Sequence, residues 1–168
     1  MEFEPAKLDA MEVAAFCIEF FKREKKMLID VHKLMKIMAF AYIYHIVKNK
    51  AILFKEPLTA TGGGLVQFDV FERYAPFYGG KAIPSAIGTG IYIEGNEKEA
   101  LVDVCKACYK EDYKSLSDLI HNNSGEFYNS RIKAKKTTIT AEDAPEIYNS
   151  FSEGGEDHGM LDILGLAA

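Results

Sequence analysis

The sequence predicts a single, mainly α-helical domain, a helical bundle built around one central helix with a small antiparallel β element. Its 168 residues provide for one core of ordinary size but not for two. A composition of 48% hydrophobic and 27% charged residues is typical of a globular protein. The segment 34–47 is apolar on most of a helical circumference, which is normal for a helix surrounded by others. It is also too short to cross a bilayer.

Two long helices are predicted in the first third of the chain. Asp9 and Glu12 have the spacing of a capping box, which begins a helix that runs to about residue 24. Its apolar positions recur at helical spacing: Met11, Ala14, Ala15, Ile18 and Phe21. Asp30 then caps the central helix, residues 30–48, on which His45 belongs to the apolar stripe and His32 lies near the surface. We therefore expect His45 to be a hydrogen-bonded core histidine.

Shorter elements are predicted in the rest of the chain. Two apolar runs in residues 51–60 indicate a small hairpin or extended pair, and a third helix covers about 66–74 because Pro76 cannot continue it. Capping boxes at Asn96–Glu99 and Thr140–Asp143 begin further helices. The remaining expectations are helices at 97–109, 113–122 and 142–151, one more turn within 125–131, and short extended segments at 91–93 and 137–140.

The chain is predicted to divide into a domain, residues 1–152, and an acidic, glycine-containing C-terminal tail, residues 153–168. Three structures stay open for the tail: a disordered terminus, a last turn packed on the domain, or a short helix that docks into a partner's groove.

Charge and cysteine content narrow the class of protein. A net charge of −5 argues against general nucleic-acid binding, and the basic clusters at 22–26 and 131–136 suit solvated surfaces. The N-terminus is acidic, unlike a signal peptide, and three cysteines without a regular framework fit a reducing cytoplasm. Cys105 and Cys108 lie in a predicted helix interior, where we expect core residues rather than a metal or redox site.

Several motifs in order resemble the Panacea-domain family, which includes the SocA antitoxin and the phage-associated GepA proteins. The resemblance covers residues 8–151. Its opening helices are similar in MEVAAFCIEFF and LIDVHKLMKIMAFAYIYHI, where the matching positions are Ile29, Leu34, Lys36, Ile37 and Tyr42. Later matches are LFKEPLTA, Ile83-Pro84, LVDVCKACYKEDYKSLSDLIH and ITAEDAPEIYNSF. The chain departs from the family where residues 60–66 replace its aromatic and Gly-Pro-Val-Val segment, and it lacks the usual Trp after the Ser-His segment.

The resemblance implies a non-enzymatic protein-binding module, antitoxin-like or adaptor-like, which neutralises a toxin or a bacterial defence effector by binding it. Phages and mobile elements carry such proteins, and an adaptor would also contact a host protease. The acidic balance of the chain suits a basic partner. No catalytic residue, metal ligand or cofactor follows from the resemblance.

The alternative is a small nucleotide-binding protein or enzyme that uses the three glycines at 62–64 and His121. A Walker loop requires a Lys directly after the last glycine, and the next Lys here is Lys81. An anion could still bind backbone amides where the glycines open the third helix. The competing interpretation is a flexible elbow that needs positive φ. His121 ends a predicted helix, where a charged imidazole would cap it.

A surplus of aromatic residues predicts the partner-binding surface in residues 61–78. One short helix cannot bury all of these rings, and aromatic residues in excess of the core are typical interface anchors. The glycines would let the surface adjust to its partner. The predicted binding residues are Gly63, Phe68, Phe71, Tyr74, Phe77 and Tyr78.

Overall fold

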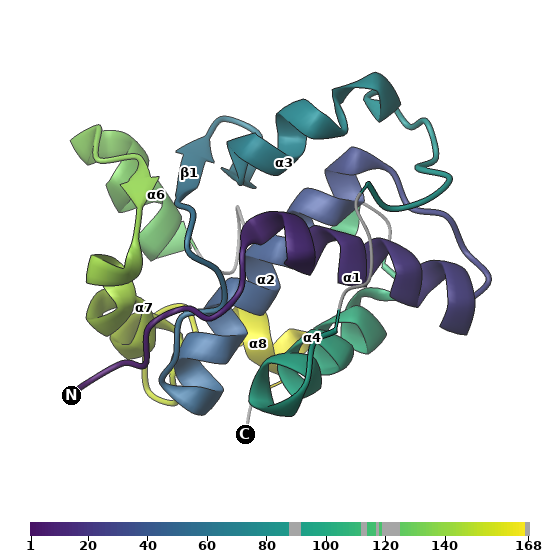
Figure 1. The fold of residues 1–168 in the computed structure, drawn as a ribbon. Helices are drawn as coiled ribbons and strands as arrows, with labels where there is room; N and C mark the ends of the chain where they lie inside the picture. The colour runs from purple at the N-terminus through teal and green to yellow at the C-terminus, as the bar shows by residue number, and fades with distance from the viewer. Residues whose placement is uncertain (88–91, 112–113, 117, 119–124, 167–168) are drawn as a thin grey trace.

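A computed structural model describes residues 1–87, 92–111, 114–116, 118 and 125–166 (Figure 1). Its centre is helix α2, Val31–Asn49, against which α1 (Ala10–Glu24), α4 (Gly95–Cys108) and α7 (Ala144–Phe151) pack. Every residue in the segment 34–46 is buried. The predicted mainly α fold around one central helix, with a small antiparallel sheet, is confirmed.

Local hydrogen bonds at the first two helices agree with the capping predictions. The capping box of Asp9 and Glu12 is present at the start of α1. At α2 the Asp30 carboxylate accepts a hydrogen bond from the Lys33 amide at 2.8 Å, and Lys50 ends the helix in the left-handed conformation. These caps satisfy backbone groups that a helix end leaves unpaired, so sequence alone locates both ends of α1 and α2 well.

The sheet has three short antiparallel strands in the order β2-β1-β3. Strand β1 (Leu58–Thr61) pairs with β2 (Gly64–Val66) on one edge and with β3 (Thr138–Ile139) on the other. Ala60 lies opposite Leu65 in this register. The predicted strand at 137–140 is confirmed, and it brings the last third of the chain beside residues 58–59.

The two apolar runs of residues 51–60 do not pair with each other, so that prediction was wrong. Ala51 and Phe54 instead form isolated parallel bridges with Glu4 and Leu8 of the N-terminal segment. The Ile52 amide donates to the Glu4 carbonyl at 2.9 Å. The second run becomes β1, whose partners lie later in the chain. Non-local pairing of this kind leaves no mark in a short window of sequence.

The third helix is shorter than predicted. Helix α3 spans Phe68–Arg73, and a 3-10 turn, η1 (Ala75–Phe77), follows it and contains Pro76. Gln67 caps α3, because its side-chain oxygen accepts a hydrogen bond from the Val70 amide at 2.8 Å. Strand β2 therefore stands between the glycines and the helix that they were expected to open.

Later helix boundaries differ in detail. Helix α4 begins at Gly95, so Asn96 lies inside it and the predicted cap at Asn96 is wrong. The predicted helix at 113–122 falls largely outside the described residues. Of the extended segment predicted at 91–93, residue 91 lies outside them, and residues 92 and 93 belong to no strand. Helix α6 spans Gly125–Ala134, longer than the single turn expected. The Thr140–Asp143 capping box is confirmed and begins the 3-10 turn η2 (Ala141–Asp143), which leads into α7.

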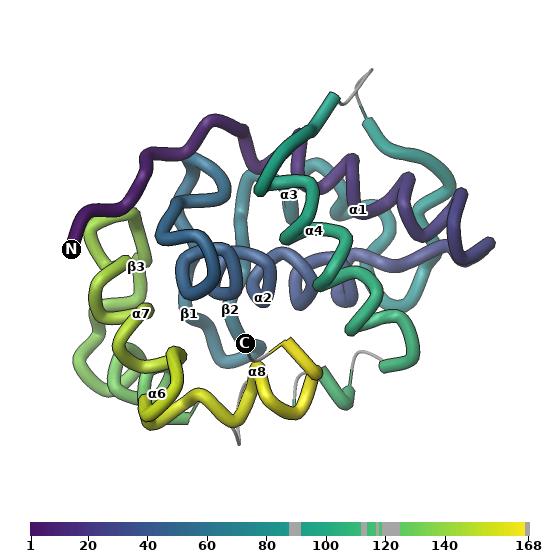
Figure 2. Tube along the Cα trace, turned by 90° about the horizontal axis from the view of Figure 1, so that it is seen from below, coloured from purple at the N-terminus to yellow at the C-terminus, as the bar shows by residue number. Residues whose placement is uncertain are grey.

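The C-terminal tail folds onto the domain. Figure 2 shows α8 (Gly159–Ile163) lying alongside the rest of the chain, and Met160 and Leu161 are buried in the core. The Asp157 carboxylate accepts hydrogen bonds from the Glu126 and Phe127 amides at 3.2 and 2.8 Å, where α6 begins. Of the three structures left open for the tail, a last turn packed on the domain agrees with the structure.

Candidate functional site

The glycines at 62–64 form the turn of a β-hairpin. Thr61 lies opposite Gly64, and the Thr61 hydroxyl accepts a hydrogen bond from the Gly63 amide and donates one to the Gly64 carbonyl, at 3.2 and 3.0 Å. Gly64, with φ 116°, is the member of the three that needs the glycine-specific conformation. The positive φ predicted for these glycines is therefore present at Gly64. The glycines connect two strands and do not open a helix, so a phosphate at this turn would meet no helix N-terminus.

A hollow of about 300 Å³ lies where this hairpin meets α2 and the segment around α3. We call it the aromatic pocket. Helix α2 contributes His32, Met35 and Lys36 to its lining, and the hairpin contributes Thr61, Gly63 and Val66. Its remaining walls are the rings of Phe68, Phe71 and Tyr78. Four of the six predicted binding residues therefore come together at one place.

The aromatic rings form a continuous edge-to-face row. The rings of Phe68 and Phe71 are 6.3 Å apart and those of Phe71 and Tyr78 are 5.9 Å apart, each pair at 81°. The His32 imidazole lies 4.5 Å from the Tyr78 ring. Phe68 and Tyr78 remain 44% and 55% exposed. Contacts of this kind orient the rings while leaving their outer faces open to a ligand.

Tyr74 is not part of the pocket, which corrects the prediction that it belongs to an exposed binding surface. Its side chain is fully buried, and its hydroxyl accepts a hydrogen bond from the Ile87 amide at 2.8 Å. Burial raises the pKa of this phenol. Tyr74 follows α3 directly and turns towards the core, so it anchors the segment instead. Phe77 is half-buried, packs on the core and does not line the pocket.

Lys36, like His32 and Met35, lines this pocket but was not predicted from the sequence as a site residue. Only 3% of it is exposed, and its ammonium donates a hydrogen bond to the Gly63 carbonyl. No ion pair joins it to any carboxylate of the described residues. Burial lowers the pKa of Lys36 to about 8. The available signal was a single lysine within the otherwise apolar run 34–47.

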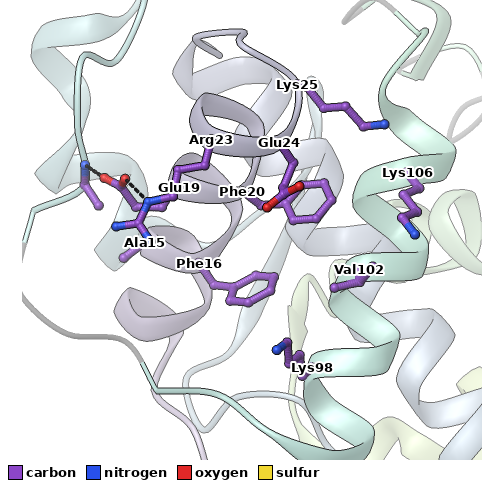
Figure 3. A pocket seen from close by; sticks show the side chains of 11 residues that line it. Ala15, Phe16, Glu19, Phe20, Arg23, Glu24, Lys25, Lys98, Val102 and Lys106 are labelled. Carbon is purple, nitrogen blue, oxygen red and sulfur yellow. Dashed lines mark hydrogen bonds and ion pairs between the residues drawn. The ribbon is translucent and has the colours of Figure 1, made fainter.

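A second hollow, of about 710 Å³, runs between α1 and α4 (Figure 3). Phe16 and Phe20 project into it from α1 towards Val102 of α4. Lys98 and Lys106 flank Val102 on the same helix. The sequence analysis missed this groove as well, although Phe16 and Phe20 are one helical turn apart and outside the apolar stripe of α1.

The charged rim of this second hollow already contains partners. Glu19 forms an ion pair with Arg23, drawn as a dashed line in Figure 3, at a distance of 3.7 Å. Glu19 also accepts a hydrogen bond from the Ala86 amide at 3.1 Å. The aromatic pocket differs because its lysine is buried with no counter-charge among the residues that the structure describes. We therefore take the aromatic pocket as the candidate site.

The histidines do not form a catalytic group in the part of the chain that the structure describes. His45 is fully buried, and its Nδ1 lies 2.9 Å from the Asn49 amide nitrogen, so the prediction of a hydrogen-bonded core histidine is confirmed. Its Nε2 has no hydrogen-bond partner within residues 1–87, 92–111 and 125–166 and is 3.8 Å from the Glu97 carboxylate. Burial lowers the pKa of His45 although Glu97 opposes this. His121 lies outside the described residues.

Cys105 and Cys108 are core residues, as predicted, and Cys17 is one as well. Cys17, Cys105 and Cys108 are all buried and none forms a disulfide. Burial raises the pKa of Cys108 to about 12, which leaves its thiol protonated and unreactive. Among residues 1–87, 92–111 and 125–166, no three His, Cys, Asp or Glu side chains gather closely enough to hold a metal ion. No helix in these ranges is long and apolar enough to cross a membrane.

Comparison with known proteins found no matching family model, no matching curated protein and no matching solved structure. The similarity to the Panacea-domain family remains a prediction from the sequence motifs.

Proposed function

We propose that this chain is a non-enzymatic protein-binding module, antitoxin-like or adaptor-like, that neutralises a toxin or a defence effector by direct binding. The observation that carries the proposal is the aromatic pocket, where Phe68 and Tyr78 are 44% and 55% exposed beside a hollow of about 300 Å³. Exposed rings around a hollow are the kind of surface on which binding energy concentrates.

Contacts within the chain hold these rings in place before a partner arrives. Phe71 is half-buried and contacts both Phe68 and Tyr78, and η1 fixes the path of the chain between them. Tyr74 anchors the same segment in the core. A partner side chain that enters the pocket would therefore bury apolar surface without a large loss of conformational entropy, which favours affinity.

The negative net charge of the chain favours a basic partner. The chain carries a net charge of −5, so long-range attraction would accelerate its association with a basic toxin or nucleic-acid-handling effector. The pocket would then supply specificity at short range.

The test is rescue of bacterial growth by co-expression with a toxic protein encoded beside this gene. We expect the wild-type chain to restore growth and to form a stable complex with the toxin in size-exclusion chromatography. The double variant Phe68→Ala, Tyr78→Ala should lose at least tenfold in affinity and should fail to rescue.

Tyr92→Ala is the matched control, because Tyr92 is 82% exposed and does not line the pocket. It should rescue as wild type does. Rescue by the double variant at wild-type affinity, with its folding confirmed by melting temperature, would contradict the proposal. Loss of the toxin in a wild-type strain but not in a strain without its proteases would identify the adaptor form of the function.

A further inference from the structure

The ammonium of Lys36 is a buried cation that has no counter-charge among the described residues. Burying a charge without a partner is unfavourable, and the Gly63 carbonyl offers a dipole but no negative charge. An ammonium has three donors, and the hairpin carbonyl takes one of them. Because Lys36 also lines the pocket, an anion in the pocket can accept from the other two.

The walls next to Lys36 select an apolar group. Phe68, Phe71 and Tyr78 present ring surfaces, and Val66 and Met35 add aliphatic ones. A volume of about 300 Å³ is at the small end of ligand pockets, which suits a single residue-sized group rather than a folded segment. The ligand should therefore carry an apolar side chain and a negative charge within a few atoms of each other.

The C-terminal residue of a polypeptide has this arrangement, because its carboxylate and its side chain share one Cα. An internal Asp or Glu has its charge at the end of the side chain and brings no apolar group with it. We infer that the aromatic pocket receives the C-terminal residue of the partner protein, with its carboxylate on Lys36 and an apolar side chain among Phe68, Phe71 and Tyr78.

The inference that the ligand comes from a partner protein rests on the proposed function. The inference that the pocket binds a carboxylate next to an apolar group does not. A basic partner satisfies both proposals, because every chain ends in a carboxylate whatever its net charge. Recognition of a chain terminus is a known way to obtain specificity from a small site.

The experiment is an NMR titration of the purified full-length chain with N-acetyl-L-phenylalanine, N-acetyl-L-phenylalaninamide and N-acetyl-L-alanine. We expect the phenylalanine carboxylate to bind at least tenfold more tightly than its amide, with amide shifts centred on Gly63, Phe68 and Tyr78. The alanine compound should bind at least tenfold more weakly as well. Equal affinity for the carboxylate and the amide would overturn the inference.

Two variants locate the carboxylate. Lys36→Met should abolish the preference for the carboxylate over the amide, whereas Lys22→Met, which removes one charge from an exposed position on α1, should retain it. An unchanged preference in a folded Lys36→Met protein would contradict the role of Lys36. Phe68→Ala should weaken the binding of both phenylalanine probes. If Lys36→Met does not fold, the comparison of the three probes on the wild-type chain still decides the question.

A last arm tests the source. A hexapeptide that ends in phenylalanine should bind at least as tightly as N-acetyl-L-phenylalanine. If 3-phenylpropanoate binds more tightly than both, the ligand is a small carboxylic acid and the inference of a protein C-terminus is wrong. None of these probes requires the biological partner. If the phenylalanine carboxylate binds selectively but growth is not rescued, the proposed function is rejected and the inferred ligand of the pocket is kept. If growth is rescued but the pocket shows no selectivity for the carboxylate, the inferred ligand is rejected and the proposed function is kept.

Discussion

The ammonium of Lys36 on the central helix donates a hydrogen bond to the carbonyl of Gly63 in the hairpin turn. This bond connects the most buried helix of the domain to its most glycine-rich segment. It also holds a positive charge in the lining of the aromatic pocket. Two features with no evident relation in sequence thus become parts of one site.

Replacing Lys36 with Met should stabilise the protein at neutral pH. The pKa of Lys36 is lowered from 10.5 to about 8, so the unfolded chain binds more protons between pH 8 and 10.5. The wild-type stability should therefore rise through this window, by at most about 3 kcal/mol from this group, while the cost of burial is fully present below pH 8. Urea unfolding at pH 7, 9 and 10.5 measures the effect.

The difference between wild type and Lys36→Met isolates this contribution, because tyrosines and cysteines that titrate in the same range are common to both. Lys22→Met serves as a control for net charge. A loss of more than about 1 kcal/mol at pH 7 in Lys36→Met would show that the bond to Gly63 outweighs desolvation.

Tyr74 and Tyr78 should respond oppositely to substitution. Tyr74→Ala removes a fully buried ring and should destabilise the fold by about 3–5 kcal/mol, and Tyr74→Phe should lose about 1–2 kcal/mol because the Ile87 amide loses its acceptor. Tyr78→Ala, at a side chain that is 55% exposed, should change stability by less than about 1 kcal/mol and should weaken partner binding instead. Thermal unfolding beside an affinity measurement separates them, and similar melting temperatures for the two alanine variants would refute this assignment.

Asp157 should make the tail indispensable for stability. Its carboxylate accepts from the Glu126 and Phe127 amides and from the Ser150 hydroxyl, the last at 3.0 Å. Asp157→Ala would leave these donors unpaired and should cost about 1–3 kcal/mol. Asp162→Ala, at an exposed position on α8, should have little effect in the same denaturant titration. Equal stability of the two variants would mean that α6 does not depend on the tail.

Gly155 should tolerate no side chain, in contrast to Gly159. A Cβ atom at Gly155 would overlap the carbonyl oxygens of Asn149 and Ser150, which belong to the backbone of α7 and cannot move aside easily. Gly155→Ala should therefore separate the tail from α7 and cost several kcal/mol, of the order of 2–4. Gly159→Ala meets no atom within 4 Å and should be neutral or slightly stabilising in α8. Comparable melting temperatures would show that the tail does not pack as described.

The sequence by itself determined the parts of this protein that depend on local chemistry. Asp9, Asp30 and Thr140 begin helical segments because a short polar side chain can satisfy nearby amides without help from the rest of the chain. The central helix followed from an apolar surface too wide for any exposed helix. The partner-binding prediction placed Phe68, Phe71 and Tyr78 in the segment that lines the pocket.

Only the tertiary structure decided what depends on distant residues. The glycines form a hairpin turn because β1 pairs with β2 and β3. The tail packs on the domain because the Asp157 carboxylate accepts a hydrogen bond from the Phe127 amide near the start of α6. Tyr74 and Tyr78 are four residues apart and equally aromatic, yet packing around α3 buries one and exposes the other. Lys36 and the aromatic rings line the same pocket for the same reason, because tertiary packing brings α2 beside the segment around α3. Burial and long-range contacts are properties of the whole packed chain, and no local pattern encodes them.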